Sequence, residues 1–272
     1  MPDRRPIGVF DSGVGGLTVA RAIIDQLPVE PLLYVGDTAR SPYGPRPVEE
    51  IRRFALDIAA YLVSRDVKML VVACNSIETA AITDVTRAAG TPVVGVIDAG
   101  VRAAVKATRN RRVGVIGTMA TIRSGAYERA LAQTRQRIEL FSQACPAFVE
   151  YVERGDTSSD ELQLIAREYL APLEAAGVDT LILGCTHYPL LSGLLQYVMG
   201  ADVTLISSAE EVAKDVYAAL LDEDLQSDAQ GPPEHEFMST GDPSQFQALA
   251  ERFLGPGLPD VRVALAEASV WK

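Results

Sequence analysis

The chain has 272 residues, 48% of them hydrophobic, and a formal net charge of −11. This length and composition suffice for a packed core without disulfides or metals. The acidic balance argues against nucleic acid or an anionic membrane surface as the main partner, because both repel a negatively charged protein. No signal segment and no run of about 18 apolar residues is present, so we expect a cytoplasmic protein that does not enter a membrane.

Short apolar runs alternate with amphipathic patterns along the whole chain, which predicts a doubly wound α/β architecture. Strands are predicted at residues 7–10, 32–35, 92–97, 113–116, 138–141, 178–183, 203–206, 237–239 and 261–265, and in the apolar run before Cys74. Helices are predicted at residues 17–27, 48–64, 76–89, 98–108, 158–176, 189–199, 209–222 and 244–254. We expect residues 145–153 to be irregular and 226–235 to form a solvent loop that carries His235.

Two pairs of segments resemble each other at almost the same separation. An apolar run that ends in a hydroxyl residue occurs at Ile7 and again 106 residues later at Val113. An apolar run that ends in a cysteine and hydrogen-bonding residues occurs at Cys74 and again 111 residues later at Cys185. The offsets indicate a duplicated α/β unit, too long in period for a solenoid. We expect two similar halves that face each other across a cleft.

The three cysteines lack CxxC spacing, which favours reduced thiols over a disulfide framework or a zinc knuckle. Cys145 precedes a proline, away from the other two, and is expected to be buried and inert. The chain has only two histidines, so a centre built from several histidines is not predicted.

Two loops at strand ends could line a site. The turn after residue 10 carries Gly13, Gly15 and Gly16, but Asp11 places a negative charge where a phosphate would bind, and capping of the next helix by Asp11 or Ser12 is the simpler interpretation. The loop at residues 36–47 contains three prolines and two glycines, which restrict its backbone, and ordered loops at strand ends often line sites.

Two thiols at equivalent strand ends narrow the chemistry. Disulfide exchange favours CxxC spacing, and a hydrolase that uses one cysteine and one histidine leaves the second thiol unexplained. Racemisation at an acidic carbon needs one base and one acid on opposite faces, which a duplicated fold supplies. None of the four lysines, Lys68, Lys106, Lys214 and Lys272, is placed for a Schiff base with pyridoxal phosphate.

The chain closely resembles the glutamate racemase family, whose members make D-glutamate for peptidoglycan without a cofactor. The motifs that carry the resemblance are Gly8–Leu17, Gly36–Arg46, Ala73–Ser76, Gly114–Thr118 and Leu183–Leu190. The resemblance runs almost from end to end. It implies two α/β domains, residues 1–97 with 209–272 and residues 98–208, with the active site between them.

The resemblance also implies a role for individual residues. Cys74 and Cys185 would be the two acid/base thiols, with Asp11 assisting Cys74, and with His187 and Glu153 assisting Cys185. The positions that would hold the substrate are Asp11, Ser12, Tyr43, Gly44, Asn75, Ser76, Thr118, Thr121, Thr186 and His187. No metal and no cofactor are implied, and a homodimer is expected.

The sequence departs from the family pattern near the first thiol. Ser76 replaces a more usual threonine, and Ile77 and Glu78 follow where small residues are typical. Glu78 adds a charge near a thiol that must ionise, and Glu150 stands where proline is usual.

Two alternatives remain open from the sequence alone. One is a racemase of the same superfamily that acts on aspartate, which is shorter than glutamate by one methylene. The other is a non-catalytic interaction protein on this scaffold, since binding to DNA gyrase occurs among members of the family.

Overall fold

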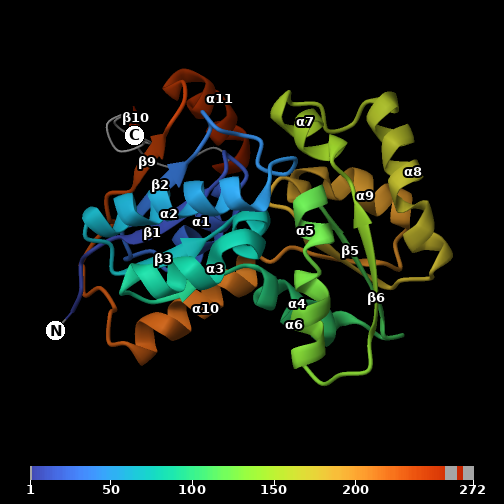
Figure 1. Ribbon diagram of the computed structural model, residues 1–272, viewed down its shortest axis with the longest axis horizontal. Helices are drawn as coiled ribbons and strands as arrows, with labels where there is room; N and C mark the ends of the chain where they lie inside the picture. The colour runs from blue at the N-terminus through green and yellow to red at the C-terminus, as the bar shows by residue number, and fades with distance from the viewer. Residues whose placement is uncertain (1, 255–261, 266–272) are drawn as a thin grey trace. The chain divides into compact units, whose positions relative to one another are not determined.

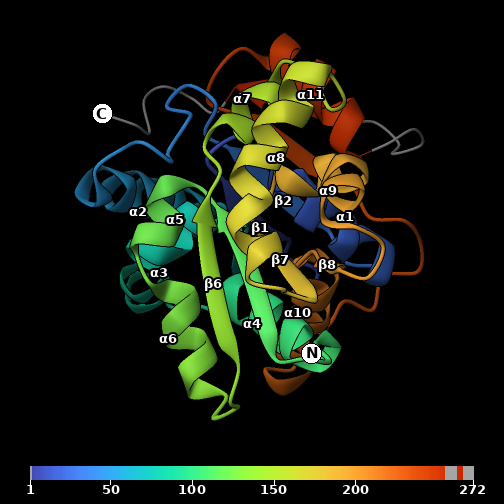
Figure 2. The same cartoon turned by 90° about the vertical axis from the view of Figure 1, so that its right-hand side faces the viewer.

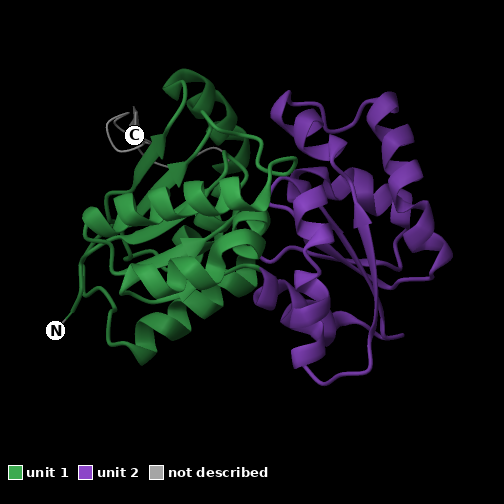
Figure 3. Cartoon of the chain, viewed as in Figure 1, with its two compact units in different colours: residues 1–96, 209–272 green, residues 97–208 purple. Residues whose placement is uncertain are grey.

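The computed structural model describes residues 2–254 and 262–265, the last four as backbone. The chain divides into two compact units, Met1–Val96 with Ala209–Lys272, and Ile97–Ser208 (Figure 3). Each unit is built on its own parallel sheet. No helix in the described residues is both long enough and apolar enough to cross a membrane.

The first unit contains a six-stranded sheet with the order β10-β9-β2-β1-β3-β4 (Figure 1). Its strands are β1 (Ile7–Asp11), β2 (Leu32–Gly36), β3 (Met69–Val72), β4 (Val93–Val94), β9 (Glu236–Ser239) and β10 (Arg262–Leu265). Its helices are α1 (Leu17–Gln26), α2 (Val48–Ser64), α3 (Asn75–Ala89), α10 (Ala209–Asp222) and α11 (Pro243–Leu254). All five pairings in this sheet are parallel.

Helices cover both faces of this sheet, which explains why its central strands are mostly apolar. Strands β1, β2 and β3 are buried at every residue, as expected for parallel strands enclosed on both sides. Right-handed crossovers place α1 and α11 on one face and α2 and α3 on the other, because the connections run in opposite directions along the sheet. The packing agrees, since α2 contacts α3 while α1 contacts α10 and α11.

The second unit contains a four-stranded parallel sheet with the order β6-β5-β7-β8 (Figure 2). Its strands are β5 (Arg112–Gly117), β6 (Glu139–Ala144), β7 (Thr180–Gly184) and β8 (Thr204–Ile206). Its helices are α4 (Ile97–Ala107), α5 (Met119–Arg123), α6 (Ala126–Gln133), α7 (Ala147–Glu153), α8 (Asp160–Ala175) and α9 (Ser192–Met199), with a 3₁₀ turn, η1, at Tyr188–Leu191. Helix α4 packs with α6, and α8 packs with α9.

The two sheets repeat one topology. The order β2-β1-β3-β4 in the first unit is matched by β6-β5-β7-β8 in the second, so β1 corresponds to β5 and β3 to β7. In each sheet the connections diverge between the two central strands, and ligands of such folds bind at the carboxyl ends of the strands there. The sequence resemblance between the segments at Ile7 and Val113, and between those at Cys74 and Cys185, therefore joins equivalent strand ends.

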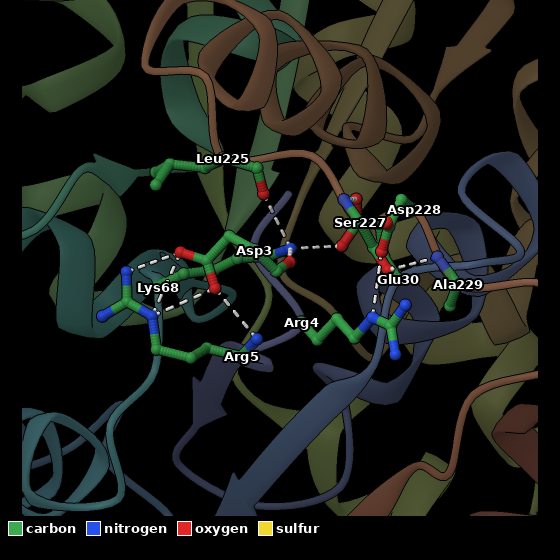
Figure 4. A network of polar contacts seen from close by, with 9 residues as sticks. All are labelled: Asp3, Arg4, Arg5, Glu30, Lys68, Leu225, Ser227, Asp228 and Ala229. Atoms are coloured by element: carbon green, nitrogen blue, oxygen red, sulfur yellow. Dashed lines mark hydrogen bonds and ion pairs between the residues drawn. The ribbon is translucent and has the colours of Figure 1, made fainter. Parts of the chain in front are cut away.

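A buried ion pair fastens the returning chain to the first unit (Figure 4). Lys68 is 1% exposed, and its Nζ donates to Glu30 Oε2 at 2.5 Å, to the carbonyl of Asp3 at 2.8 Å and to that of Leu225 at 2.8 Å. The other oxygen of Glu30 accepts from the amide of Ser227 at 2.8 Å. Lys68 thus joins the amino-terminal segment to the loop after α10, and the loss of either charge would leave its partner buried and unpaired at a cost of about 3–5 kcal/mol.

Three expectations from the sequence differ from the structure. Residues 145–153 are not irregular, because α7 begins after Pro146, which is suited to a helix start. The strand expected at 92–97 is reduced to Val93–Val94, and α4 already begins at Ile97. The helix expected at 189–199 is preceded by η1, so its first turn is 3₁₀ rather than α.

Candidate active site

Cys74 lies between β3 and α3 in the first unit, as the N-cap residue of the helix. Its side chain is 6% exposed, and its Sγ donates to Ser12 Oγ at 3.5 Å. Ser12 follows Asp11, which is fully buried at the end of β1 and accepts the amide of Gly13 on Oδ1 at 2.8 Å. A side chain at Gly16 would place its Cβ 2.6 Å from the Cβ of Asp11, so this close turn requires glycine.

The surroundings of Cys74 keep its thiol protonated. Burial raises the pKa of Cys74 to about 12, and the negative charge of Asp11 acts in the same direction. Hydrogen bonds from the hydroxyl of Ser12 and from the amides of Ile77 and Ser12 oppose the increase in pKa without cancelling it. At neutral pH, the protonated form of Cys74 is therefore favoured.

Cys185 follows β7 directly and is 7% exposed. Its Sγ lies 3.8 Å from Nδ1 of His187, and Nε2 of the same ring lies 3.1 Å from Glu153 Oε1 at the end of α7. The imidazole is 4% exposed, and the side chain of Glu153 is about one-third exposed. Thiol, imidazole and carboxylate form a chain through which a proton could move to or from sulfur.

Close packing fixes the turn that carries Cys185. A Cβ at Gly184 would lie 2.7 Å from the carbonyl oxygen of Ile116 on the neighbouring strand, so only glycine fits at the end of this strand. After the turn, the hydroxyl of Tyr188 donates to the carbonyl of Cys145 at 2.8 Å. The bond ties the start of η1 to the end of β6.

The remaining candidate residues also lie at or just beyond strand ends. Asn75 and Ser76 are both 3% exposed in the first turn of α3. Thr118 follows β5 and caps α5, since its Oγ1 accepts the amide of Thr121 at 3.3 Å and lies 3.1 Å from the Thr121 hydroxyl. Thr186, between the second thiol and its histidine, is 7% exposed. Residues with hydroxyl or amide side chains thus follow both Cys74 and Cys185 at the strand ends.

Tyr43 and Gly44 belong to the loop that follows β2. Tyr43 is 1% exposed, and its hydroxyl donates to the carboxylate of Asp37. The phenol therefore points at Asp37 within the first unit. Asp37 is not among the residues predicted from the sequence, although its position directly after a buried strand was a signal for it.

The candidate residues divide between the two units. The first unit holds Asp11, Ser12, Tyr43, Gly44, Cys74, Asn75 and Ser76. The second unit holds Thr118, Thr121, Glu153, Cys185, Thr186 and His187. Within each unit, the residues gather at the carboxyl edge of the sheet.

Glu78, a departure from the family pattern, and Cys145, the third thiol, both lie in defined surroundings. The carboxylate of Glu78 accepts the amide of Val96 at 2.5 Å, so it is directed at the segment before α4. A Cβ on Gly95 would lie 2.4 Å from Glu78 Oε1, so a larger residue there would displace the Glu78 carboxylate. Cys145 is fully buried, as expected, and burial and the charge of Cys185 raise its pKa. Among residues 2–254 and 262–265, no group of three or more metal-binding side chains could hold an ion.

The comparisons with known proteins agree with one another. Residues 7–216 match the family model described as Asp/Glu/Hydantoin racemase. The glutamate racemase of Parafrankia sp. strain EAN1pec is 58% identical over 97% of this chain and 95% of its own length. The crystal structure of glutamate racemase isoform RacE1 from Bacillus anthracis superimposes with a TM-score of 0.93 at 42% identity, covering 98% of each chain.

A second solved structure brings a ligand into the comparison. The glutamate racemase of Francisella tularensis, solved in complex with D-glutamate, superimposes with a TM-score of 0.90 at 36% identity, covering 97% of this chain and 98% of that one. The family match, the relatives and the fold all lead to the same group of enzymes. The chain belongs to the Asp/Glu/Hydantoin racemase family and, within it, to the glutamate racemases.

Proposed function

We propose that the protein interconverts L-glutamate and D-glutamate by proton transfer at the α-carbon, with Cys74 and Cys185 as the two acid/base groups. The observation that carries the proposal is the equivalence of the two thiols. Each lies at the carboxyl end of the corresponding strand of a repeated topology. Each also has a polar neighbour at its sulfur, Ser12 at Cys74 and His187 at Cys185.

The reaction balances without a co-reactant. One cysteine acts as thiolate and takes the α-proton, so the Cα–H bond breaks, an S–H bond forms, and the electron pair passes toward the α-carboxylate of the substrate. The other cysteine then gives its proton to the opposite face of the α-carbon and keeps the S–H electron pair. One thiolate has replaced the other, and the same two steps in reverse order convert D-glutamate to L-glutamate.

The neighbours of each thiol would assist its proton transfers. Asp11 favours the protonated form of Cys74, which suits Cys74 to give a proton. His187 can take the proton of Cys185 or return it, while Glu153 orients the imidazole and stabilises its charged form. Charge that develops on the substrate carboxylate would be stabilised by donors fixed beforehand. The proposed substrate-binding groups are Asp11, Ser12, Tyr43, Gly44, Asn75, Ser76, Thr118, Thr121, Thr186 and His187.

The biological role follows from the product. Close relatives at 54–58% identity are named as glutamate racemases, and we place this chain in the same step, the supply of D-glutamate for peptidoglycan in the cytoplasm.

The experiment is racemisation of L-glutamate in D₂O, without added cofactor, by the wild type and by Cys74→Ala and Cys185→Ala. We expect the wild type to form D-glutamate that carries deuterium at Cα, and each single variant to lose racemisation. Full activity in either variant, or activity only after addition of pyridoxal phosphate, would reject the two-thiol assignment. Parallel assays with L-aspartate test the substrate, since a preference for aspartate would replace glutamate in the proposal.

A further inference from the structure

Asp37 is a buried carboxylate that the proposed reaction does not use. It follows β2 directly and is fully buried. Its Oδ2 accepts the hydroxyl of Tyr43 and the Nε of Arg40, the latter at 2.6 Å, and its Oδ1 accepts the hydroxyl of Thr240 at 2.7 Å. Its amide donates to the carbonyl of Asp11 at 3.0 Å. Four bonds on one residue connect the Tyr43 loop, the end of β1 and the segment after β9.

The contacts around Arg40 extend this network to helix α2. The Nη1 of Arg40 lies 3.2 Å from Asp57 Oδ2, and its guanidinium lies over the ring of Phe54, 4.1 Å from the centroid. The ring of Tyr43 packs against the same phenylalanine, with 5.5 Å between centroids. The first half of the loop is thus held from one side by α2 and from the other by the carboxylate of Asp37.

The start of the loop is joined to the segment after β9. Thr38 Oγ1 lies 2.6 Å from Ser239 Oγ, and the amide of Ala39 donates to the hydroxyl of Thr240 at 3.0 Å. The amide of Gly241 donates to Thr38 Oγ1 at 3.0 Å. Thr240 therefore accepts from the loop with the same hydroxyl that it donates to Asp37. The position of the loop therefore depends on residues about 200 positions later in the chain.

The chemistry of Tyr43 sets what this network can do. Burial raises the pKa of its phenol well above the ordinary value, and the negative charge of Asp37 acts in the same direction, so the hydroxyl stays protonated and keeps donating. A buried donor with a fixed acceptor orients its ring, and the ring orients the backbone of Tyr43 and Gly44. That backbone is the part of the loop proposed above to hold the substrate.

We propose that Asp37 is a positioning residue for glutamate binding: its carboxylate holds Tyr43, Arg40 and Thr240 so that the backbone at Tyr43 and Gly44 is fixed before the substrate arrives. The inference rests on the proposed function. A preorganised binding loop lowers the free energy lost on binding, so its loosening raises KM for both enantiomers. The effect on kcat is small, because neither Asp37 nor the Tyr43 hydroxyl contacts a thiol in the network described.

The test uses Tyr43→Phe and Asp37→Asn in the full chain. Tyr43→Phe removes only the donor and keeps the ring against Phe54, while Asp37→Asn keeps an acceptor and removes the charge. We expect KM for L- and D-glutamate to rise about five- to tenfold in each variant, as for the loss of one buried hydrogen bond, with kcat within about twofold of wild type. Amide hydrogen exchange across residues 38–46 should become faster in both.

The matched control is Tyr61→Phe, which removes another buried tyrosine hydroxyl of the same unit. Tyr61 lies on α2, and its hydroxyl donates to Met238 Sδ at 3.2 Å and accepts from Arg65 at 2.7 Å, neither of which is a partner of Asp37. The control should keep the wild-type KM and the wild-type exchange at 38–46. The combination Asp37→Asn with Tyr43→Phe should be no worse than the more severe single variant, because both changes act on the one hydrogen bond between residues 37 and 43.

Two results would overturn the inference. Faster exchange at 38–46 with unchanged KM would mean that the loop is ordered by Asp37 but does not hold glutamate. Raised KM with unchanged exchange would mean that Asp37 acts on binding by another route. If Asp37→Asn does not fold, Tyr43→Phe still decides between these results. Failure of the wild type to racemise glutamate would reject the proposed function and is recognised before any variant is compared.

Discussion

The two thiol regions occupy equivalent places in the repeated topology and yet differ in their neighbours. Cys74 has a serine hydroxyl at 3.5 Å and a buried carboxylate, Asp11, whose charge raises its pKa. Cys185 has an imidazole nitrogen at 3.8 Å, and that imidazole contacts the carboxylate of Glu153. The first setting stabilises a protonated thiol, whereas the second provides a group that can share the proton.

This difference suggests how two similar halves can perform opposite steps. The proposed reaction needs one thiol as a base while the other acts as an acid, and two thiols with identical neighbours would not be distinguished in this way. An imidazole beside one sulfur and a carboxylate beside the other break the symmetry without any change in strand order. The repeated topology thus places the two thiols equivalently, while their neighbours differ.

The largest expected effect comes from removing the neighbour of each thiol. Asp11→Asn and His187→Asn should each lower kcat/KM about 10²- to 10³-fold, as for the loss of a general acid or base partner. Because L- and D-glutamate have equal free energy, kcat/KM must fall equally in the two directions. The asymmetry should instead appear in the primary isotope effects measured with 2-deuterated L- and D-glutamate.

In each variant, the larger isotope effect should belong to the enantiomer whose α-proton is removed by the impaired thiol. The two variants should therefore show opposite asymmetry. Thr86→Val, on the exposed side of α3, is the control and should behave as wild type. If both variants show the larger isotope effect with the same enantiomer, the two thiols do not act on opposite enantiomers as proposed.

A smaller effect is expected at Glu153, which reaches sulfur only through His187. Glu153→Gln keeps a hydrogen-bond acceptor and removes the charge, so we expect kcat/KM to fall about tenfold, less than for His187→Asn. The side chain is about one-third exposed, and solvent weakens its influence. Glu150→Gln on the same helix is the matched control. The side chain of Glu150 is 78% exposed, and its carboxylate lies 3.9 Å from the guanidinium of Arg154. Equal losses in both variants would remove Glu153 from the proton path.

The pKa of Cys74 offers a measurement that does not depend on turnover. Its value of about 12 means that little thiolate forms at pH 8, and that the thiolate fraction rises as pH increases toward 12. Asp11→Asn removes a negative charge and so lowers the pKa of this thiol. Alkylation of Cys74 by iodoacetamide at pH 8, followed by peptide mass spectrometry, should become several-fold faster in Asp11→Asn while racemisation becomes slower.

Cys145 serves as the internal reference for this labelling. Its pKa is also raised by burial, it has no contact with Asp11 among the described interactions, and its labelling should be equally slow in both proteins. Slower alkylation of Cys74 in Asp11→Asn would show that Asp11 activates the thiolate, which would reverse the contrast drawn between the two regions.

The smallest expected effect concerns how the Cys185 turn is anchored. Tyr188→Phe removes the bond to the carbonyl of Cys145 and should lower the free energy of unfolding by about 1–2 kcal/mol, measured by urea denaturation. We expect kcat to change less than threefold, because the ring still fills its buried place. Tyr197→Phe, in which the native side chain is 65% exposed, should leave stability unchanged. A loss of activity as large as that of His187→Asn would give Tyr188 a direct part in catalysis.

Much of the fold could be read from the sequence because the signals are local. Buried parallel strands such as β1 and β7 are continuous apolar runs that end in glycine or a polar residue, and the helices between them are amphipathic. The same reasoning failed at α7, where Cys145 and Pro146 suggested a break. A proline at a helix start is as compatible with the helix as with a loop, and only the packing of Phe148 and Val152 into the second unit decides between them.

The sequence by itself determined the two strand-end cysteines, the repeated order of elements and the family, since each depends on short patterns and on residue identity. Only the tertiary structure decided which groups the side chains meet. Asp37 meets Thr240 across about 200 residues of chain, Glu153 meets His187 from another helix, and Glu78 meets the amide of Val96. Contacts between segments distant in sequence depend on how strands order themselves in a sheet, and that order leaves no local periodicity to read.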